Sequence, residues 1–159
     1  MKPEVDTALG GFFVTLMTEI APQLGGEYST GSVGLIGMSI AMAAQEYDRA
    51  ADIRVRENEA MRALFAEAAR LVEDEARDIS LVEDKAFAKR LLDAAATKDT
   101  SFKVSALNAS NDALKSLLIE LHAAVETSKA SWASALDRKI WDLLVEAAEG
   151  RKLVFPLAG

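Results

Sequence analysis

The chain has 159 residues, 50% of them hydrophobic and 27% charged, so it is long enough to bury one substantial core. Its 25 acidic and 18 basic residues give a formal net charge of −7, which argues against nucleic acid or an anionic membrane as the main partner. The chain has no cysteine and one histidine, which excludes disulfides, thiol nucleophiles, iron–sulfur clusters and multi-histidine metal sites.

The first expected element is a helix over residues 3–21. Its apolar residues fall on one helical stripe: Val5, Leu9, Phe12, Phe13, Leu16 and Ile20. Gly10 and Gly11 weaken this helix, and Pro22 ends it. The glycine- and serine-rich segment 22–32 that follows is expected to be a loop.

A long helical pattern runs from Val33 to Ile79 without a strong breaker after Gly37. As one straight helix it would be about 70 Å long, which exceeds the size of a compact domain with a radius of gyration of about 15 Å. The helix either breaks between Arg54 and Glu59, or stays whole and packs its overhang against a second subunit. We favour the break, because Arg54 and Asn58 place polar groups at successive positions of the apolar seam.

The pattern Ser80-Leu81-Val82-Glu83 has the form of a capping box and predicts the start of a helix that ends near Thr97. A polar connection follows over 98–101. It offers three candidate helix caps, Asp99, Thr100 and Ser101.

A helical stripe then continues to Gly150, which is placed to stop the helix. Hydroxyl residues cluster within 126–131, and this predicts a boundary between two helices there. The apolar tail, 151–159, is interrupted by Pro156 and is expected to lie extended across a hydrophobic groove. Together these elements predict an all-α protein with a single domain over 1–159. We expect an antiparallel up-and-down helical bundle with one or two additional helices.

The segment Thr30–Gly37 has the most unusual local composition, because glycines recur every third residue at an expected helix start. Free amides there are suited to an anion, but no lysine follows the last glycine as a phosphate-binding loop requires. The small residues Gly34, Gly37, Ala41 and Ala44 favour close packing of another helix. The segment resembles the start of formiminotransferase-cyclodeaminase-type bundles over a short stretch. It lacks their proline-bearing triple-glycine sequence, and the resemblance assigns no residue a role.

Four residues are candidate ligand contacts. Tyr28, Ser32 and Tyr47 flank the glycine-rich helix start and are expected to edge a small pocket. His122 shares a helix face with Glu126, so the two are either an acid–base pair or an ordinary surface pair. No catalytic or metal-ligating residues are predicted. The di-iron pattern of helical bundles cannot be built with a single histidine.

These observations predict an acidic, soluble helical-bundle protein that acts through self-association or partner binding, with a homodimer as the first expectation. The alternative is a small-molecule or anion-binding protein with a pocket near the glycine-rich start of the second helix. An enzyme that uses His122 and carboxylates is less favoured. No cofactor, nucleic acid or membrane partner is expected. The longest uncharged apolar-rich run falls short of the about 20 residues that span a bilayer, and the acidic N-terminus does not fit an export signal, so the expected location is the cytoplasm.

Overall fold

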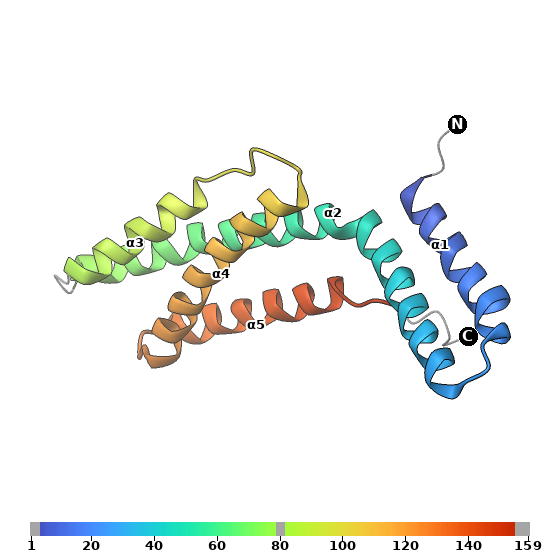
Figure 1. The fold of residues 1–159 in the computed structure, drawn as a ribbon. Coiled ribbons are helices and arrows are strands. Elements are labelled where there is room, and N and C mark those ends of the chain that lie inside the picture. Colours follow the sequence, from blue (N-terminus) through green and yellow to red (C-terminus); the bar gives the residue numbers. More distant parts are fainter. Residues whose placement is uncertain (1–3, 79–81, 155–159) are drawn as a thin grey trace. The chain divides into compact units, whose positions relative to one another are not determined.

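The computed structural model describes residues 4–78 and 82–154, and the side chains of 73–84 also lie outside this description. The described residues form α-helices and no strand, which confirms the all-α prediction. The helices are α1 (Val5–Thr15), α2 (Glu27–Asp78), α3 (Val82–Ala95), α4 (Val104–Thr127) and α5 (Ala133–Gly150) (Figure 1).

The chain divides into two compact units, and α2 contributes to both. The first, here called the hairpin unit, comprises Met1–Ala50 and Lys152–Gly159. The second, the bundle unit, comprises Ala51–Arg151. The single domain expected over 1–159 stays a prediction.

In the hairpin unit, α1 runs antiparallel to the first part of α2 (Figure 1). Beyond α1 the chain continues through a π-helical turn, Leu16–Ile20, and a 3₁₀ turn, Ala21–Gln23. Pro22 accounts for this change of winding, because proline donates no backbone hydrogen bond and its ring crowds the carbonyl four residues earlier.

The two arms of the hairpin pack closely against each other at Gly37. A Cβ placed on this glycine would lie 3.0 Å from Met17 Sδ and 3.4 Å from Phe13 Cδ2. The close packing that the small-residue face predicted is therefore found where α1 crosses α2. A Cβ on Gly34, by contrast, would meet nothing within 4 Å in the described part of the chain.

The loop predicted over 22–32 is wrong from Glu27 onward, because α2 begins at that residue. None of the described glycines has a positive φ, so Gly31 and Gly34 take ordinary helical geometry. The Thr30 hydroxyl donates a hydrogen bond to the Gly26 carbonyl at 3.1 Å, which supports the first turn. Glycine lowers helix stability by about 1 kcal/mol per residue but does not forbid a helix.

The break favoured between Arg54 and Glu59 is also wrong, since α2 is continuous there. Both seam residues make hydrogen bonds in place of apolar contacts. Arg54 Nε donates to Asn108 Oδ1 at 2.8 Å, and the Asn58 amide donates to Asp99 at 3.2 Å. Because distant side chains accept hydrogen bonds from both residues, the helix need not end to expose them to water.

In the bundle unit, the second part of α2 and helices α3, α4 and α5 follow one another up and down, as predicted (Figure 1). The two C-terminal helices meet at the boundary expected within 126–131. The capping box at Ser80–Glu83 lies outside the residues described in full. The largest fully buried apolar side chains are Met61, Phe65, Leu91, Leu107, Leu121, Leu136 and Ile140.

α5 ends at Gly150 as predicted, although by an ordinary right-handed turn in which the Arg151 amide bonds to the Ala147 carbonyl at 3.2 Å. The tail then reaches Gln45 of α2. The side-chain amide of Gln45 pairs with the backbone of Val154 through two hydrogen bonds of 2.8 Å, one to the carbonyl and one from the amide. The Val154 side chain itself is 71% exposed, and the tail after it lies outside the described residues.

Candidate functional site

An exposed face of α2 in the hairpin unit is the strongest candidate site. Its residues follow one another at spacings of three or four, with Leu35 and Ile36 adjacent, which places them on one side of the helix. We call this set the docking stripe; it comprises Tyr28, Ser32, Leu35, Ile36, Ser39, Ala43 and Tyr47. Tyr28 is 90% exposed, Leu35 72% and Ile36 53%. Large apolar side chains gathered on a surface are typical of interaction sites and of ligand-binding grooves.

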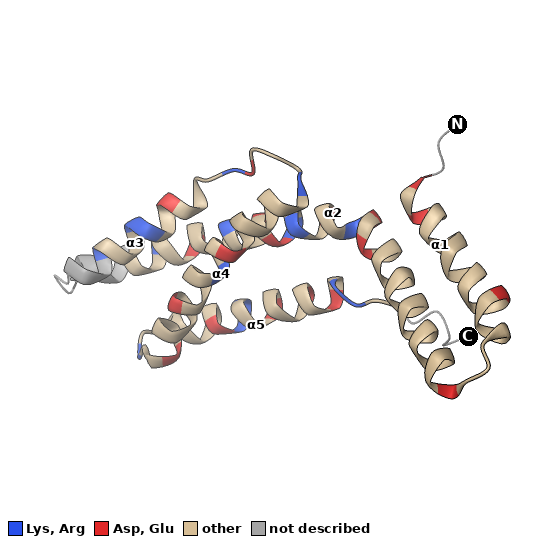
Figure 2. Cartoon of the chain, viewed as in Figure 1, with Lys and Arg blue, Asp and Glu red and all other residues tan. Residues whose placement is uncertain are grey.

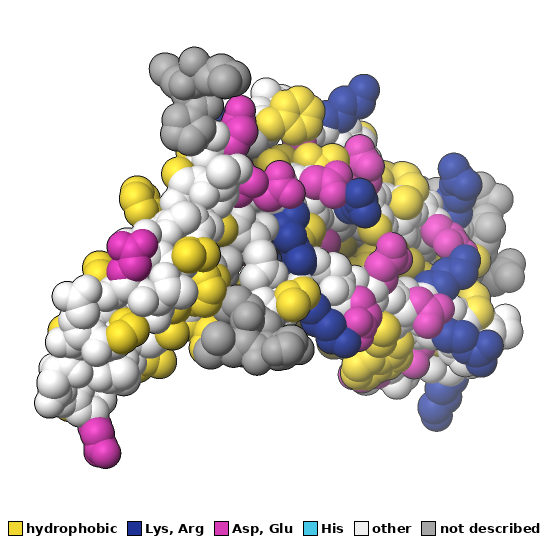
Figure 3. Space-filling model, turned by 90° about the vertical axis from the view of Figure 1, so that its right-hand side faces the viewer, with side chains coloured by type: hydrophobic (Ala, Val, Ile, Leu, Met, Phe, Trp, Pro, Cys, Tyr) yellow, Lys and Arg dark blue, Asp and Glu magenta, His cyan; other side chains and the backbone are white. Residues whose placement is uncertain are grey.

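The docking stripe lies in a region of unusual charge. The sequence has no charged residue from Tyr28 to Gln45, and no lysine or arginine between Lys2 and Arg49. Figure 2 accordingly shows α1 and the first part of α2 in tan, with acidic residues only near their ends. In Figure 3, viewed from the side of this unit, hydrophobic side chains are spread over its surface. A helix that faces water normally carries charges on its outer face, so this part of α2 is suited to being covered.

A shallow apolar groove of about 350 Å³ adjoins the docking stripe within the hairpin unit. One lining residue comes from α1 and the others from α2: Leu9, Leu35, Ile36, Ser39, Ile40 and Ala43. Two helices pack by inserting the side-chain ridges of one into the grooves of the other.

Three of the four sequence-predicted ligand residues belong to the docking stripe. Tyr28 and Ser32 are one turn apart, but Tyr47 lies nineteen residues beyond Tyr28, or roughly 28 Å along the helix. These residues therefore do not edge a common small pocket. An open depression at the start of α2 is lined by other residues, namely Leu24, Gly25, Gly26, Glu27, Thr30 and Gly31.

The fourth residue, His122, lies on α4 in the bundle unit. Its Nε2 is 3.0 Å from Asp137 Oδ1 on α5 and 3.7 Å from Glu126 Oε1 on α4. The Trp141 ring meets the imidazole edge to face, with ring centroids 5.3 Å apart. Sequence reasoning found Glu126 from its helical spacing, but missed the nearer Asp137, which only the pairing of α4 with α5 brings close. These contacts hold the two helices together.

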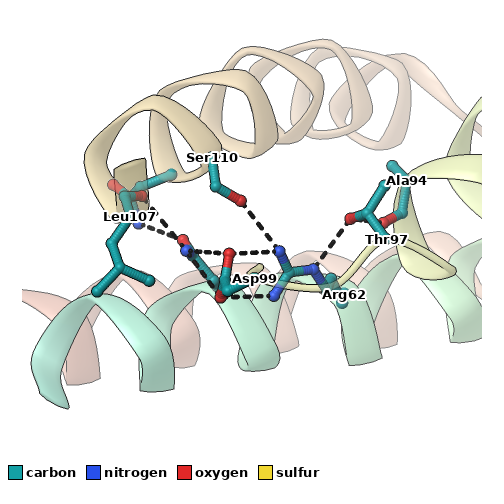
Figure 4. A network of polar contacts seen from close by, with 8 residues as sticks. Arg62, Ala94, Thr97, Asp99, Leu107 and Ser110 are labelled. Carbon is teal, nitrogen blue, oxygen red and sulfur yellow. Dashed lines mark hydrogen bonds and ion pairs between the residues drawn. The ribbon is translucent and has the colours of Figure 1, made fainter. Parts of the chain in front are cut away.

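A buried ion pair joins α2 to the connection between α3 and α4 (Figure 4). The Arg62 guanidinium donates to both carboxylate oxygens of Asp99, at 2.8 and 3.0 Å, and the two side chains are 10% and 8% exposed. Arg62 also donates to Thr97 and Ser110. The hydrogen bond from Arg62, with further help from Ser110 and Asn58, lowers the pKa of Asp99 to about 2. The prediction of Asp99 as a helix cap is wrong, because its carboxylate faces α2 and α4 begins after Lys103 without a side-chain cap.

A second buried carboxylate, Glu57, continues this polar layer along α2. Arg151 binds it through both terminal oxygens, and Asn111 Nδ2 donates to it at 2.9 Å. Burial raises the pKa of Glu57, but the hydrogen bonds from Arg151 and Asn111 and the charge of Lys115 outweigh this, so the pKa lies below its ordinary value. Asn111 also donates to Asn58 at 2.9 Å, which links the two ion pairs.

This buried polar layer has a structural role. Its members are paired with one another across α2, α4 and the chain after α5, so their charges are neutralised inside the bundle. Because a slip of one helix would leave a buried charge without its partner, the layer fixes how the helices register. The sequence carried one signal of it, the polar residue Asn58 on an apolar seam.

Comparison with protein-family models, curated proteins and solved structures finds no match to the chain. Within the described ranges, no group of three or more histidine, aspartate or glutamate side chains stands close enough to hold a metal ion. No helix among the described residues combines the length and apolarity that crossing a membrane requires.

Proposed function

We propose that this chain is a helical interaction module that binds a partner helix on the docking stripe. The observation that carries the proposal is a row of exposed, uncharged residues along one face of α2, with Leu35 72% and Ile36 53% exposed at its centre. Burying an apolar side chain of this size contributes about 1.5–3 kcal/mol, so a helix that covers both offsets part of the free energy that association costs.

The length of the docking stripe matches a helical partner. From Tyr28 to Tyr47 it extends about 28 Å, the length of a helix of roughly 19 residues, and amphipathic helices are recognised by grooves of this kind. The small-molecule alternative draws less support, because Tyr28 and Tyr47 are too far apart to contact one compact ligand.

The test is a helical peptide of defined sequence. We would use a capped peptide of about 20 residues with leucines at alternating three- and four-residue spacing, alanine and glutamine elsewhere and lysine at both ends. Binding to the full chain is followed by fluorescence anisotropy. We expect Leu35→Glu to weaken binding at least about tenfold, because a charge would be buried in the contact.

Ile119→Glu is the matched control. Ile119 lies on α4 of the bundle unit and is 71% exposed, nearly the same as Leu35. Its substitution adds the same charge outside the docking stripe and should leave peptide affinity unchanged. Equal losses of affinity in both variants, or no binding by the wild type, would refute the proposed function.

A further inference from the structure

Residues on and beside the docking stripe are arranged with approximate two-fold symmetry along α2. About a midpoint between Gly37 and Met38, Tyr28 is equivalent to Tyr47 and Ser32 to Ala43. Closer to the centre, Leu35 is equivalent to Ile40. Aromatic residues thus correspond to aromatic residues, small to small and Leu35 to Ile40, whereas the central pair sets Ile36 against the small Ser39.

We infer that the occupant of the docking stripe is a second copy of this chain, bound with its α2 antiparallel. The inference rests on the proposed function and names its partner. In a two-fold symmetric antiparallel contact, each residue meets the residue at the same distance on the other side of the midpoint in the partner copy. Tyr28 then packs against Tyr47 of the partner copy, and Ser32 meets Ala43 of the partner copy, where two small side chains let the helices approach closely.

The groove beside the docking stripe supports the same arrangement. Leu35 is an exposed side chain at the edge of the groove, which Ile40 and Ala43 also line. Antiparallel packing inserts Leu35 of each copy into the groove of its partner, so the same apolar contact forms twice across the two-fold axis. The four helices of the two hairpins would then form the kind of core that a single hairpin lacks.

Size and charge set the strength of this dimer. A helix face about 28 Å long and about 11 Å wide covers on the order of 300 Å², well below the about 800 Å² per partner of a stable interface. Antiparallel pairing also places Glu27 near Asp48 of the partner copy, two like charges at each end. We therefore expect a dimer that dissociates on dilution and whose association constant rises with salt, because salt screens the acidic ends.

Disulfide cross-linking tests the arrangement cleanly, because the chain has no cysteine of its own. A Ser32→Cys variant is mixed with an Ala43→Cys variant and oxidised, and the cross-linked species are separated by mass. The antiparallel dimer brings these two sites together. It separates Ser32 from Ser32 of the partner copy, and likewise the two Ala43 sites, by about 16 Å along the helix axis. This exceeds the about 7 Å that a disulfide spans.

We expect the mixed disulfide to exceed each same-site disulfide at least about fivefold. Ile119→Cys, outside the docking stripe, gives the background of random collisions. Same-site disulfides in excess would mean a parallel pair and overturn the inference. So would a sedimentation run that shows only monomers at every concentration and salt.

The outcomes separate the inference from the proposed function. If the leucine peptide binds the docking stripe while the chain stays monomeric, the inference that a second copy is the occupant is wrong. The proposed function as a helix-binding module then remains. If cross-links form at the background level and Leu35→Glu leaves peptide binding unchanged, both fail.

Discussion

Asp99 shows how one side chain determines the structure of a connection. Residues 96–103 join α3 to α4 without helical structure, and Asp99 ties this connection to α2 through Arg62 and Asn58. Its carboxylate is 8% exposed, so screening by water is weak. Removing the charge would leave the Arg62 guanidinium buried without its partner.

The lowered pKa of Asp99 predicts how stability depends on pH. The ordinary pKa of 3.8 falls to about 2 in the folded protein. The ion pair therefore stabilises the fold at pH values above about 4, and this contribution is lost as the pH falls from about 4 toward 2. We expect Asp99→Asn to lower the free energy of unfolding by at least about 2 kcal/mol at pH 7, and by much less near pH 2.

Urea denaturation of both proteins across this pH range measures the difference. Asp93→Asn is the control, because Asp93 pairs with Lys89 at 2.7 Å but is 65% exposed. A surface pair of this kind contributes about 0–1 kcal/mol. A stability difference between wild type and Asp99→Asn that stays constant from pH 7 to pH 2 would show that the carboxylate charge is not what matters.

In helix α2, Gly34 has free space around it and Gly37 is closely packed. We therefore expect alanine to be tolerated at the first position better than at the second. Gly34 has open space where a Cβ would go, whereas at Gly37 the Cβ would lie 3.0 Å from Met17 Sδ. We expect Gly34→Ala to raise the stability of the hairpin unit by about 1 kcal/mol through helix propensity. Gly37→Ala should gain less or destabilise, because the Met17 side chain must move away from the added methyl group.

Thermal unfolding followed by circular dichroism compares the two variants with the wild type. Gly37→Ala serves as the internal comparison, since both substitutions add one methyl group to the same helix. If Gly37→Ala were the more stable variant, the contact between α1 and α2 would not be as close as described.

The same helix shows what a sequence can and cannot predict. Apolar spacing located the α-helices of the bundle unit and the boundary between α4 and α5, because that signal is local. The break expected at Arg54 and Asn58 failed because their partners, Asn108 and Asp99, are 54 and 41 residues away. The same limit applies to the candidate site. Tyr28, Ser32 and Tyr47 were predicted as ligand contacts, and the predicted loop over 22–32 hid the fact that they share one helix face.

At the scale of the whole molecule, the two units bury very different side chains. The bundle unit encloses large residues such as Phe65, Leu107 and Leu136. In the hairpin unit, none of the residues of α1 is fully buried, and the buried apolar residues described there are alanines, Ala21, Ala41 and Ala50. Because local stability follows buried apolar area, the hairpin unit should open at lower free energy than the bundle unit.

Amide hydrogen exchange at two protein concentrations tests this difference and connects it to function. In dilute protein we expect α1 and residues 27–50 to exchange faster than α4 and α5, since few buried side chains hold them closed. At high concentration exchange should slow over 28–47 and not in α4 or α5, because a second copy covers that face and binding stabilises the state that binds. The Leu35→Glu variant should keep fast exchange at both concentrations. Equal protection of the two units in dilute protein would instead mean that the hairpin unit is stable without a partner, and the need for an occupant on α2 would disappear.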